Sequence, residues 1–146
     1  MGPHSEVQYL DSYPVFVAES PAKCRDFYCK YFGFVTVFEA SWFVMLNAGG
    51  ERPVSLAFMH PDHPSSPPSP AAFRGDGALF TLQVEDATAA YEKVTGLGLQ
   101  CDLPLRDEPW GQRRFGVIDP AGVWVDVVEQ IEPEEGWWDP YLGQQA

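Results

Sequence analysis

The sequence has no long hydrophobic run, no paired cysteine motif and few basic residues. No stretch reaches the roughly 18 apolar residues that a membrane-spanning helix needs, so no membrane span is expected. Because Met1–Leu10 is polar, we also expect no secretory signal peptide. The cysteines Cys24, Cys29 and Cys101 lack C-x-x-C spacing. This arrangement predicts reduced thiols in a cytoplasmic protein rather than a disulfide framework.

Basic residues are the scarcest charged class. The chain carries 9 Lys and Arg against 21 Asp and Glu, which gives a formal net charge of −12. Binding to nucleic acid requires a basic face, so nucleic acid is not an expected partner. A membrane is not expected either, because the chain has no long apolar run. An acidic surface attracts cationic ligands, but the same charge also serves solubility alone.

What the chain does have is a large apolar content, 45% of its 146 residues. This is sufficient for one compact domain or for two small fused modules. Ser20 and Pro21 begin a predicted helix that Gly33 ends, and Asp86 begins a second one that ends at Gly96 or Gly98. Period-two alternation and turn residues predict strands at 12–18, 34–39, 42–46, 54–59, 78–84 and 99–103, followed by a hairpin within 107–130.

That hairpin is the most informative stretch. The turn Asp119–Gly122 has Asp, Pro and Gly at the positions that a type I turn favours. After it, Val123, Val125 and Val127 alternate with Trp124 and Asp126. The valine face is predicted to pack on a core. The opposite face pairs a large aromatic ring with a carboxylate, which is typical of a cavity wall, although core packing of the ring is an alternative.

The two halves of the chain repeat one another. Val84 lies 67 positions after Val17, and Gly122 lies 72 positions after Gly50. The implied order is strand, helix and three strands, twice. We therefore predict an α+β fold of two βαβββ modules in tandem, each a curved four-stranded mixed sheet with one covering helix.

The predicted boundaries follow from the repeat. One domain, residues 1–130, contains module 12–59 and module 77–130, joined by the Pro-rich linker 60–76. The tail 131–146 contains Trp137 and Trp138, which are too apolar for a free tail. We expect the tail to dock on the domain or on a dimer partner.

Three segments carry a resemblance to a known family: YPVFVAESPAKCRDFYCKYFGF, FTLQVEDATAAYEKVTGLG and PWGQRRFGVIDPAGVWVDVVE. Together they resemble the vicinal oxygen chelate superfamily, which includes glyoxalase I, extradiol dioxygenases and bleomycin-resistance proteins. The resemblance covers residues 12–130 and is closest to the bleomycin-resistance branch. It implies a glyoxalase/bleomycin-resistance fold whose sheets curve around a cavity. It also implies a homodimer with ligand clefts formed by both subunits.

Metal enzymes of the superfamily take one ligand from each of four strands. The resemblance places these positions at Tyr13, Val54 or Leu56, Leu79 and Asp126. Val and Leu have no donor atom. Tyr coordinates a metal only when its hydroxyl is deprotonated, and the pKa of that hydroxyl is about 10. A single carboxylate does not hold zinc or iron. We therefore expect no metal and no cofactor.

The sequence and the resemblance together predict a metal-free binding protein that sequesters an aromatic or peptidic antibiotic in an aromatic-lined cleft. We predict no catalytic residue. The predicted ligand-binding residues are Trp42, Trp110, Phe115, Trp124, Asp126, Phe38, Phe43, Phe58, Tyr13 and Arg113. Arg113 and Arg114 are consecutive on a strand, so only one of them faces the cleft.

Two enzymatic alternatives stay open at this point. One is a lyase, isomerase or dioxygenase with an atypical metal site built from Asp126, Tyr13 and His60. The other is a metal-free enzyme in which Asp126 acts as a general base.

Overall fold

A computed structural model describes residues 7–64 and 71–143, and it confirms the α+β fold with two βαβββ modules. Residues 65–70 of the Pro-rich linker lie outside the described residues. The first module contains β1 (Val15–Val17), α1 (Pro21–Phe32), β2 (Val35–Glu39), β3 (Phe43–Ala48) and β4 (Val54–Met59). The second contains β5 (Leu79–Gln83), α2 (Ala87–Gly96), β6 (Leu103–Glu108), β7 (Gln112–Ile118) and β8 (Trp124–Gln130).

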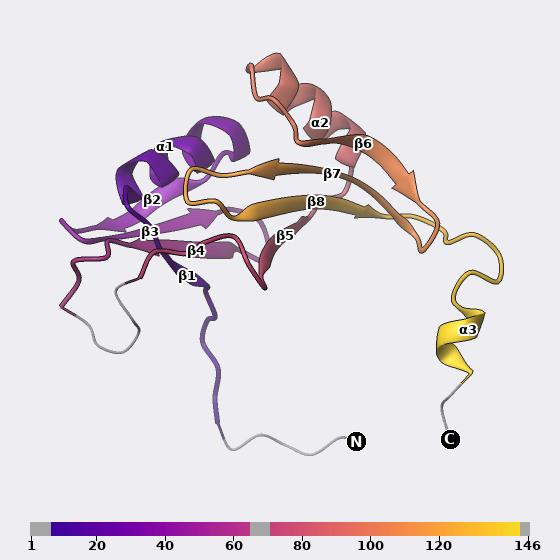
Figure 1. Ribbon diagram of the computed structural model, residues 1–146, viewed down its shortest axis with the longest axis horizontal. Coiled ribbons are helices and arrows are strands. Elements are labelled where there is room, and N and C mark those ends of the chain that lie inside the picture. Colours follow the sequence, from indigo (N-terminus) through magenta and orange to yellow (C-terminus); the bar gives the residue numbers. More distant parts are fainter. Residues whose placement is uncertain (1–6, 65–70, 144–146) are drawn as a thin grey trace.

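Each module forms one four-stranded mixed sheet of the same topology. The strand orders are β1-β4-β3-β2 in the first sheet and β5-β8-β7-β6 in the second. The pairs β1–β4 and β5–β8 are parallel, and all other neighbours are antiparallel. Both helices lie on the same side of the two sheets (Figure 1). We call the opposite side of each sheet its open face.

The core fills the space between the helices and the sheets and runs through both modules. Its buried members include Tyr28 of α1, Phe58 of β4 and Val125 and Val127 of β8. The prediction that the valine face of the last strand packs on a core is therefore confirmed. The tyrosine also links the modules, because its hydroxyl donates to Asp119 Oδ2 at 2.5 Å from the turn between β7 and β8.

The helix ends follow the predicted signals, and they also explain one wrong strand prediction. Ser20 Oγ accepts a hydrogen bond from Lys23 N, and Gly33 adopts φ 70° after α1. After α2, however, the backbone N–H of Leu97 and Leu99 bonds back to carbonyls of the helix, with Gly98 at φ 95°. Leu99 is held by this cap and residues 99–102 form no strand, so the strand predicted at 99–103 begins only at Leu103.

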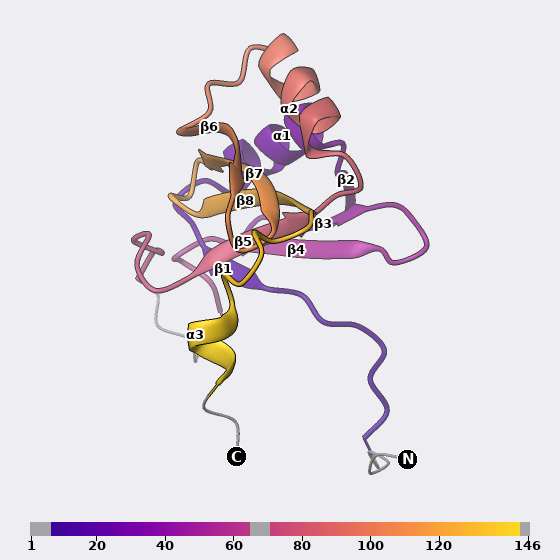
Figure 2. The ribbon, with the colours of Figure 1, turned by 90° about the vertical axis from the view of Figure 1, so that its right-hand side faces the viewer.

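The tail turns back onto the connection between β6 and β7. Ile131 N donates to Gly111 O at 2.9 Å, and Trp138 Nε1 donates to Trp110 O at 2.8 Å. The short helix α3 (Asp139–Leu142) then lies on the side of the second sheet away from α2 (Figures 1 and 2). Among the described helices, none has the length and apolar character to cross a membrane.

Candidate functional site

The open face of the second sheet carries two of the four polar or charged residues that are buried in the described part of the chain, Glu108 and Asp126. Strand register pairs Gly116 with Asp126 and Ile118 with Trp124. Val125 and Val127 point into the core, so Trp124 and Asp126 point away from it. Arg114 shares this open face because it lies two residues before Gly116 on β7.

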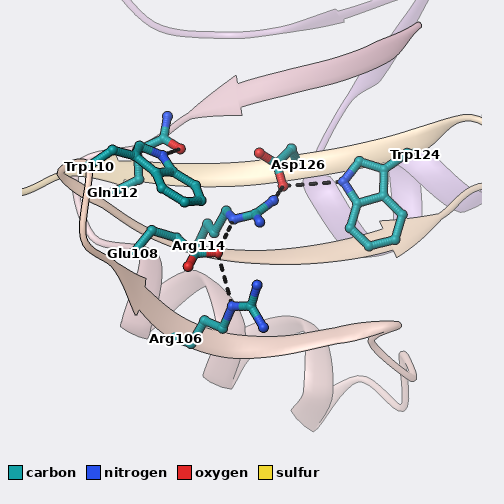
Figure 3. A network of polar contacts seen from close by, with 7 residues as sticks. All are labelled: Arg106, Glu108, Trp110, Gln112, Arg114, Trp124 and Asp126. Carbon is teal, nitrogen blue, oxygen red and sulfur yellow. Dashed lines mark hydrogen bonds and ion pairs between the residues drawn. The ribbon is translucent and has the colours of Figure 1, made fainter. Parts of the chain in front are cut away.

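A chain of charged groups runs across this face from β8 to β6 (Figure 3). Arg114 Nη1 donates to Asp126 Oδ1 at 3.1 Å, and Arg114 Nε donates to Glu108 Oε2 at 2.7 Å. Arg106 Nε donates to the same Glu108 oxygen at 2.9 Å. Asp126 Oδ1 also accepts from Trp124 Nε1 at 3.2 Å. Each carboxylate is thus matched by a guanidinium before any ligand arrives.

The network keeps both of its carboxylates nearly out of water. Glu108 is 8% exposed and Asp126 is 5% exposed. Burial alone disfavours the charged form of Glu108, but the hydrogen bonds from Arg114 and Arg106 outweigh it and lower its pKa. Burial likewise works against the charge of Arg114, and its two carboxylate partners reverse that effect and raise its pKa. Glu108 and Arg114 therefore stay ionised at neutral pH.

Trp124 lies across the glycine of the neighbouring strand. A Cβ at Gly116 would come within 2.7 Å of Trp124 Cε2 and would overlap Cζ2 of the same ring. Only glycine leaves room for the indole to lie against the sheet. The ring is half-buried, so it packs on the sheet and still presents apolar surface to the open side.

We expect Gly116→Ala to push the Trp124 indole off the sheet and to break its contact with Asp126. Overpacking of this kind costs about 1–3 kcal/mol of unfolding free energy. Urea unfolding gives the cost, and near-ultraviolet circular dichroism reports the displaced ring. Gly96→Ala is the matched control, because nothing lies within 4 Å of a Cβ there. An unchanged aromatic spectrum in the Gly116 variant would contradict this packing.

Trp110 forms the second flat wall of the site. The Arg114 guanidinium lies 5.5 Å from the centroid of the Trp110 ring. Trp110 Nε1 donates to Gln112 Oε1 at 2.8 Å. The ring of Trp137 from the tail also lies close to Trp110, 5.7 Å away from centroid to centroid. Trp110 thus joins the charged network to the aromatic tail, and both hold its orientation.

The remaining predicted aromatics group on the first sheet. Phe38 and Phe43 share its open face with ring centroids 6.3 Å apart, and Trp42 lies 5.7 Å from Phe43. Tyr13 precedes β1 and is 45% exposed. In the described part of the chain, no ring contact joins this group to Trp110 or Trp124. The predicted set is therefore divided between two sheets.

Three predicted residues do not reach either open face. Phe58 and Phe115 are 0% exposed and belong to the core, because each alternates with residues of the open face on its strand. Arg113 instead pairs with Asp107 through two hydrogen bonds, of 2.7 and 3.1 Å, on the other side of β7 from Arg114. Of the two consecutive arginines, Arg114 is the one in the site. Glu108 and Arg106 were missed.

The donor set does not fit the metal site of the fold. Val54, Leu56 and Leu79 offer no donor, and register places Thr81 rather than Leu79 beside Asp126. The carboxylate of Asp126 is already bound by Arg114 and Trp124. Throughout 7–64 and 71–143, no group of three or more His, Cys, Asp or Glu residues gathers in a geometry that would hold a metal ion. His60 accepts from Asp62 N instead.

Comparison with known proteins places this geometry in a family. Solved structures with the same fold include a glyoxalase/bleomycin resistance protein/dioxygenase from Nocardioides, at 18% identity and TM-score 0.70, covering 90% of this chain and 91% of that one. A superfamily member from Sphaerobacter thermophilus is 24% identical at TM-score 0.65, covering 85% and 98%. A lactoylglutathione lyase from Agrobacterium tumefaciens is 18% identical at TM-score 0.65, covering 84% and 94%.

At these identities the structures show the fold alone, and no curated protein matches the chain. The sequence itself supplies the family. The model of the Glyoxalase/Bleomycin resistance protein/Dioxygenase superfamily matches residues 12–127, which is most of the chain. The chain belongs to the glyoxalase/bleomycin resistance protein/dioxygenase superfamily.

Proposed function

We propose that this protein is a metal-free, cytoplasmic small-molecule binding protein of the bleomycin-resistance type. It sequesters an aromatic or peptidic antibiotic on the open face of the second sheet, without changing it chemically. The observation that supports this most is the pairing of two indole walls, Trp110 and Trp124, with a polar floor whose charges are already compensated.

The floor favours binding over chemistry. The carboxylate charges of the floor are already compensated by arginine, so they are not the unpaired groups that a general base usually provides. Asp126 accepts from Arg114 and Trp124 through Oδ1, and Glu108 accepts from two arginines through Oε2. What the face does offer is flat apolar ring surface, and stacking on it is worth about 0.5–1.5 kcal/mol per aromatic pair.

The open faces also support a homodimer as part of the proposal. Leu79 and Ile118 on the second sheet are 57% and 50% exposed, and Val35 and Phe38 on the first sheet are both 58% exposed. Apolar side chains exposed together mark interaction surfaces. A second copy of the chain over these faces would bury them and turn each shallow face into an enclosed cleft.

The binding hypothesis predicts quenching of tryptophan fluorescence by at least one compound from a panel of planar aromatic and peptidic antibiotics, bleomycin included. We expect micromolar or tighter affinity and recovery of the compound unchanged. Trp124→Leu and Trp110→Leu should each weaken binding about 2–10-fold, since each removes one stacking surface. Arg113→Gln, on the other face of the same strand, is the matched control and should leave affinity unchanged.

Two outcomes would contradict the proposal. One is a panel in which no antibiotic binds while small metabolites do. The other is turnover of a bound compound that Asp126→Asn abolishes without loss of binding, which would favour a metal-free enzyme. Stoichiometric zinc, nickel, iron or manganese in protein purified without chelators would instead favour the metal-dependent alternative with Tyr13 and His60.

A further inference from the structure

A second site lies on the helix side of the molecule, away from the open faces. A cavity of about 220 Å³ sits where the two modules meet. The end of α1 contributes Tyr31 and Phe32 to its wall, β5 contributes Leu82, and α2 contributes Ala90, Lys93 and Val94. It is smaller than the roughly 300–1,000 Å³ of sites for drug-sized ligands, so its occupant is a small molecule.

The cavity exists because the two helices carry apolar stripes of different size. Val94 of α2 is the structural counterpart of Tyr28 of α1, because each is buried and stands eight residues after the N-cap of its helix, Asp86 or Ser20. Tyr28 fills its surroundings, with ring contacts to Phe34 at 5.4 Å and to Phe58 at 5.6 Å, centroid to centroid. The smaller Val94, together with Ala90, leaves the equivalent space in the second module empty.

The mouth of this cavity has the opposite charge from the rest of the chain. The protein has a net charge of −12 and only three lysines. Lys93 lines the cavity, and the ammonium of Lys30 lies 5.1 Å from the ring centroid of Tyr31, another lining residue. Within the described residues, neither ammonium forms an ion pair with a carboxylate. Two of the three lysines are thus available to an anion at one place.

We propose that this cavity binds a small carboxylate with an apolar body, of the size of a medium-chain fatty acid. The hydrocarbon part lies between α2 and the end of α1, and the carboxylate meets Lys93 and Lys30 at the mouth. Burial of the chain supplies most of the affinity, about 0.8 kcal/mol for each CH₂ group removed from water. The lysines select for negative charge. This site is independent of the antibiotic proposal, because none of the residues assigned to antibiotic binding lines it.

Isothermal titration calorimetry with octanoate tests the proposal on the full chain. We expect one octanoate per chain with submillimolar affinity, weaker binding of 1-octanol, and no binding of octylamine. Val94→Phe, which places in the second module the ring that the first module has, should abolish octanoate binding. Ala90→Leu fills the same cavity from a less buried position and should do the same, so a folding defect in one variant does not decide the result.

The lysine variants test whether the mouth of the cavity binds the carboxylate. Lys93→Gln should weaken octanoate binding about two- to fivefold, as for a partly exposed ion pair, and leave 1-octanol binding unchanged. Lys23→Gln, at the only other lysine, should change neither. The proposal fails if octanoate does not bind the wild-type chain, if octylamine binds as well as octanoate, or if a folded cavity-filling variant binds octanoate like the wild type.

Discussion

Replacing Arg114 with Ala is expected to destabilise the protein by about 2–4 kcal/mol. The guanidinium is the shared partner of Glu108 and Asp126, whose side chains are only 7% and 8% exposed. Without it, Asp126 keeps only the Trp124 N–H, and Glu108 keeps only the exposed Arg106. Breaking a fully buried pair costs about 3–5 kcal/mol. We place the expected value lower because 18% of the Arg114 side chain is exposed.

The pH dependence of stability should change sign in the same variant. In the wild type the pKa of Glu108 lies below its usual value of 4.5, because its arginine hydrogen bonds outweigh burial. Glu108 therefore contributes to the free energy of unfolding above pH 4.5, and this contribution is lost as the pH falls through its folded-state pKa. Without Arg114, the effect of burial on Glu108 dominates. Protonation of Glu108 in acid should therefore raise the stability of the variant.

Arg113→Ala is the matched control for this prediction. Arg113 is adjacent in sequence, but it pairs with Asp107, whose side chain is 55% exposed. Exposed pairs contribute about 0–1 kcal/mol. Urea unfolding of the two variants between pH 3.5 and about 7 measures both effects, over the range in which carboxylates titrate. Equal losses of unfolding free energy in the two variants would show that the charged network on the open face does not stabilise the protein.

The contrast between the two arginines shows what the sequence can and cannot predict about this site. Alternation along a strand implies that consecutive residues face opposite sides of the sheet. It correctly predicts that Trp124 and Asp126 are neighbours on one face. It does not say which arginine joins them, because that depends on the register between β7 and β8. Glu108 was missed for the same reason. Its place follows from pairing across the irregular β6–β7 ladder.

The fold itself was largely predictable, because turn residues, helix caps and the internal repeat all indicate the same architecture. The errors have local causes. Phe58 and Phe115 were assigned to the cleft on aromatic character, yet both point to the helices and pack in the core. Tyr28 carries in the sequence a signal for the contact between the modules. A hydroxyl on a buried helix stripe needs a partner, and the turn carboxylate Asp119 supplies it across the module boundary.

Loss of the hydrogen bond between Tyr28 and Asp119 is the second change with a large expected effect. Asp119→Ala should lower the free energy of unfolding by about 3 kcal/mol or more. Asp119 is 4% exposed and accepts from Tyr28 through one oxygen. Its other oxygen accepts from the N–H groups of Ala121 and Val123 at 2.8 and 3.0 Å. The variant therefore leaves the tyrosine hydroxyl and two turn N–H groups without their acceptor. Each buried unsatisfied group costs about 1–3 kcal/mol.

Asp119→Asn separates the hydrogen bonds from the charge. Burial is the main influence on the Asp119 carboxyl and raises its pKa above 3.8, despite the hydrogen bonds that it accepts. A raised carboxyl pKa means that stability from this group is greatest below pH 3.8 and falls as the pH rises through the folded-state value. The amide keeps an acceptor and carries no charge, so Asp119→Asn should cost far less than Asp119→Ala and should remove this pH dependence.

A double-mutant cycle shows whether the bond between the modules carries the effect. Tyr28→Phe alone should cost about 1–3 kcal/mol, because Asp119 Oδ2 loses its donor. If the two side chains act through one another, Tyr28→Phe combined with Asp119→Ala costs less than the sum by about 0.5–3 kcal/mol. Strictly additive losses in urea unfolding would mean that Asp119 acts only within its own turn. The hydrogen bond between Tyr28 and Asp119 would then not be what couples the two modules.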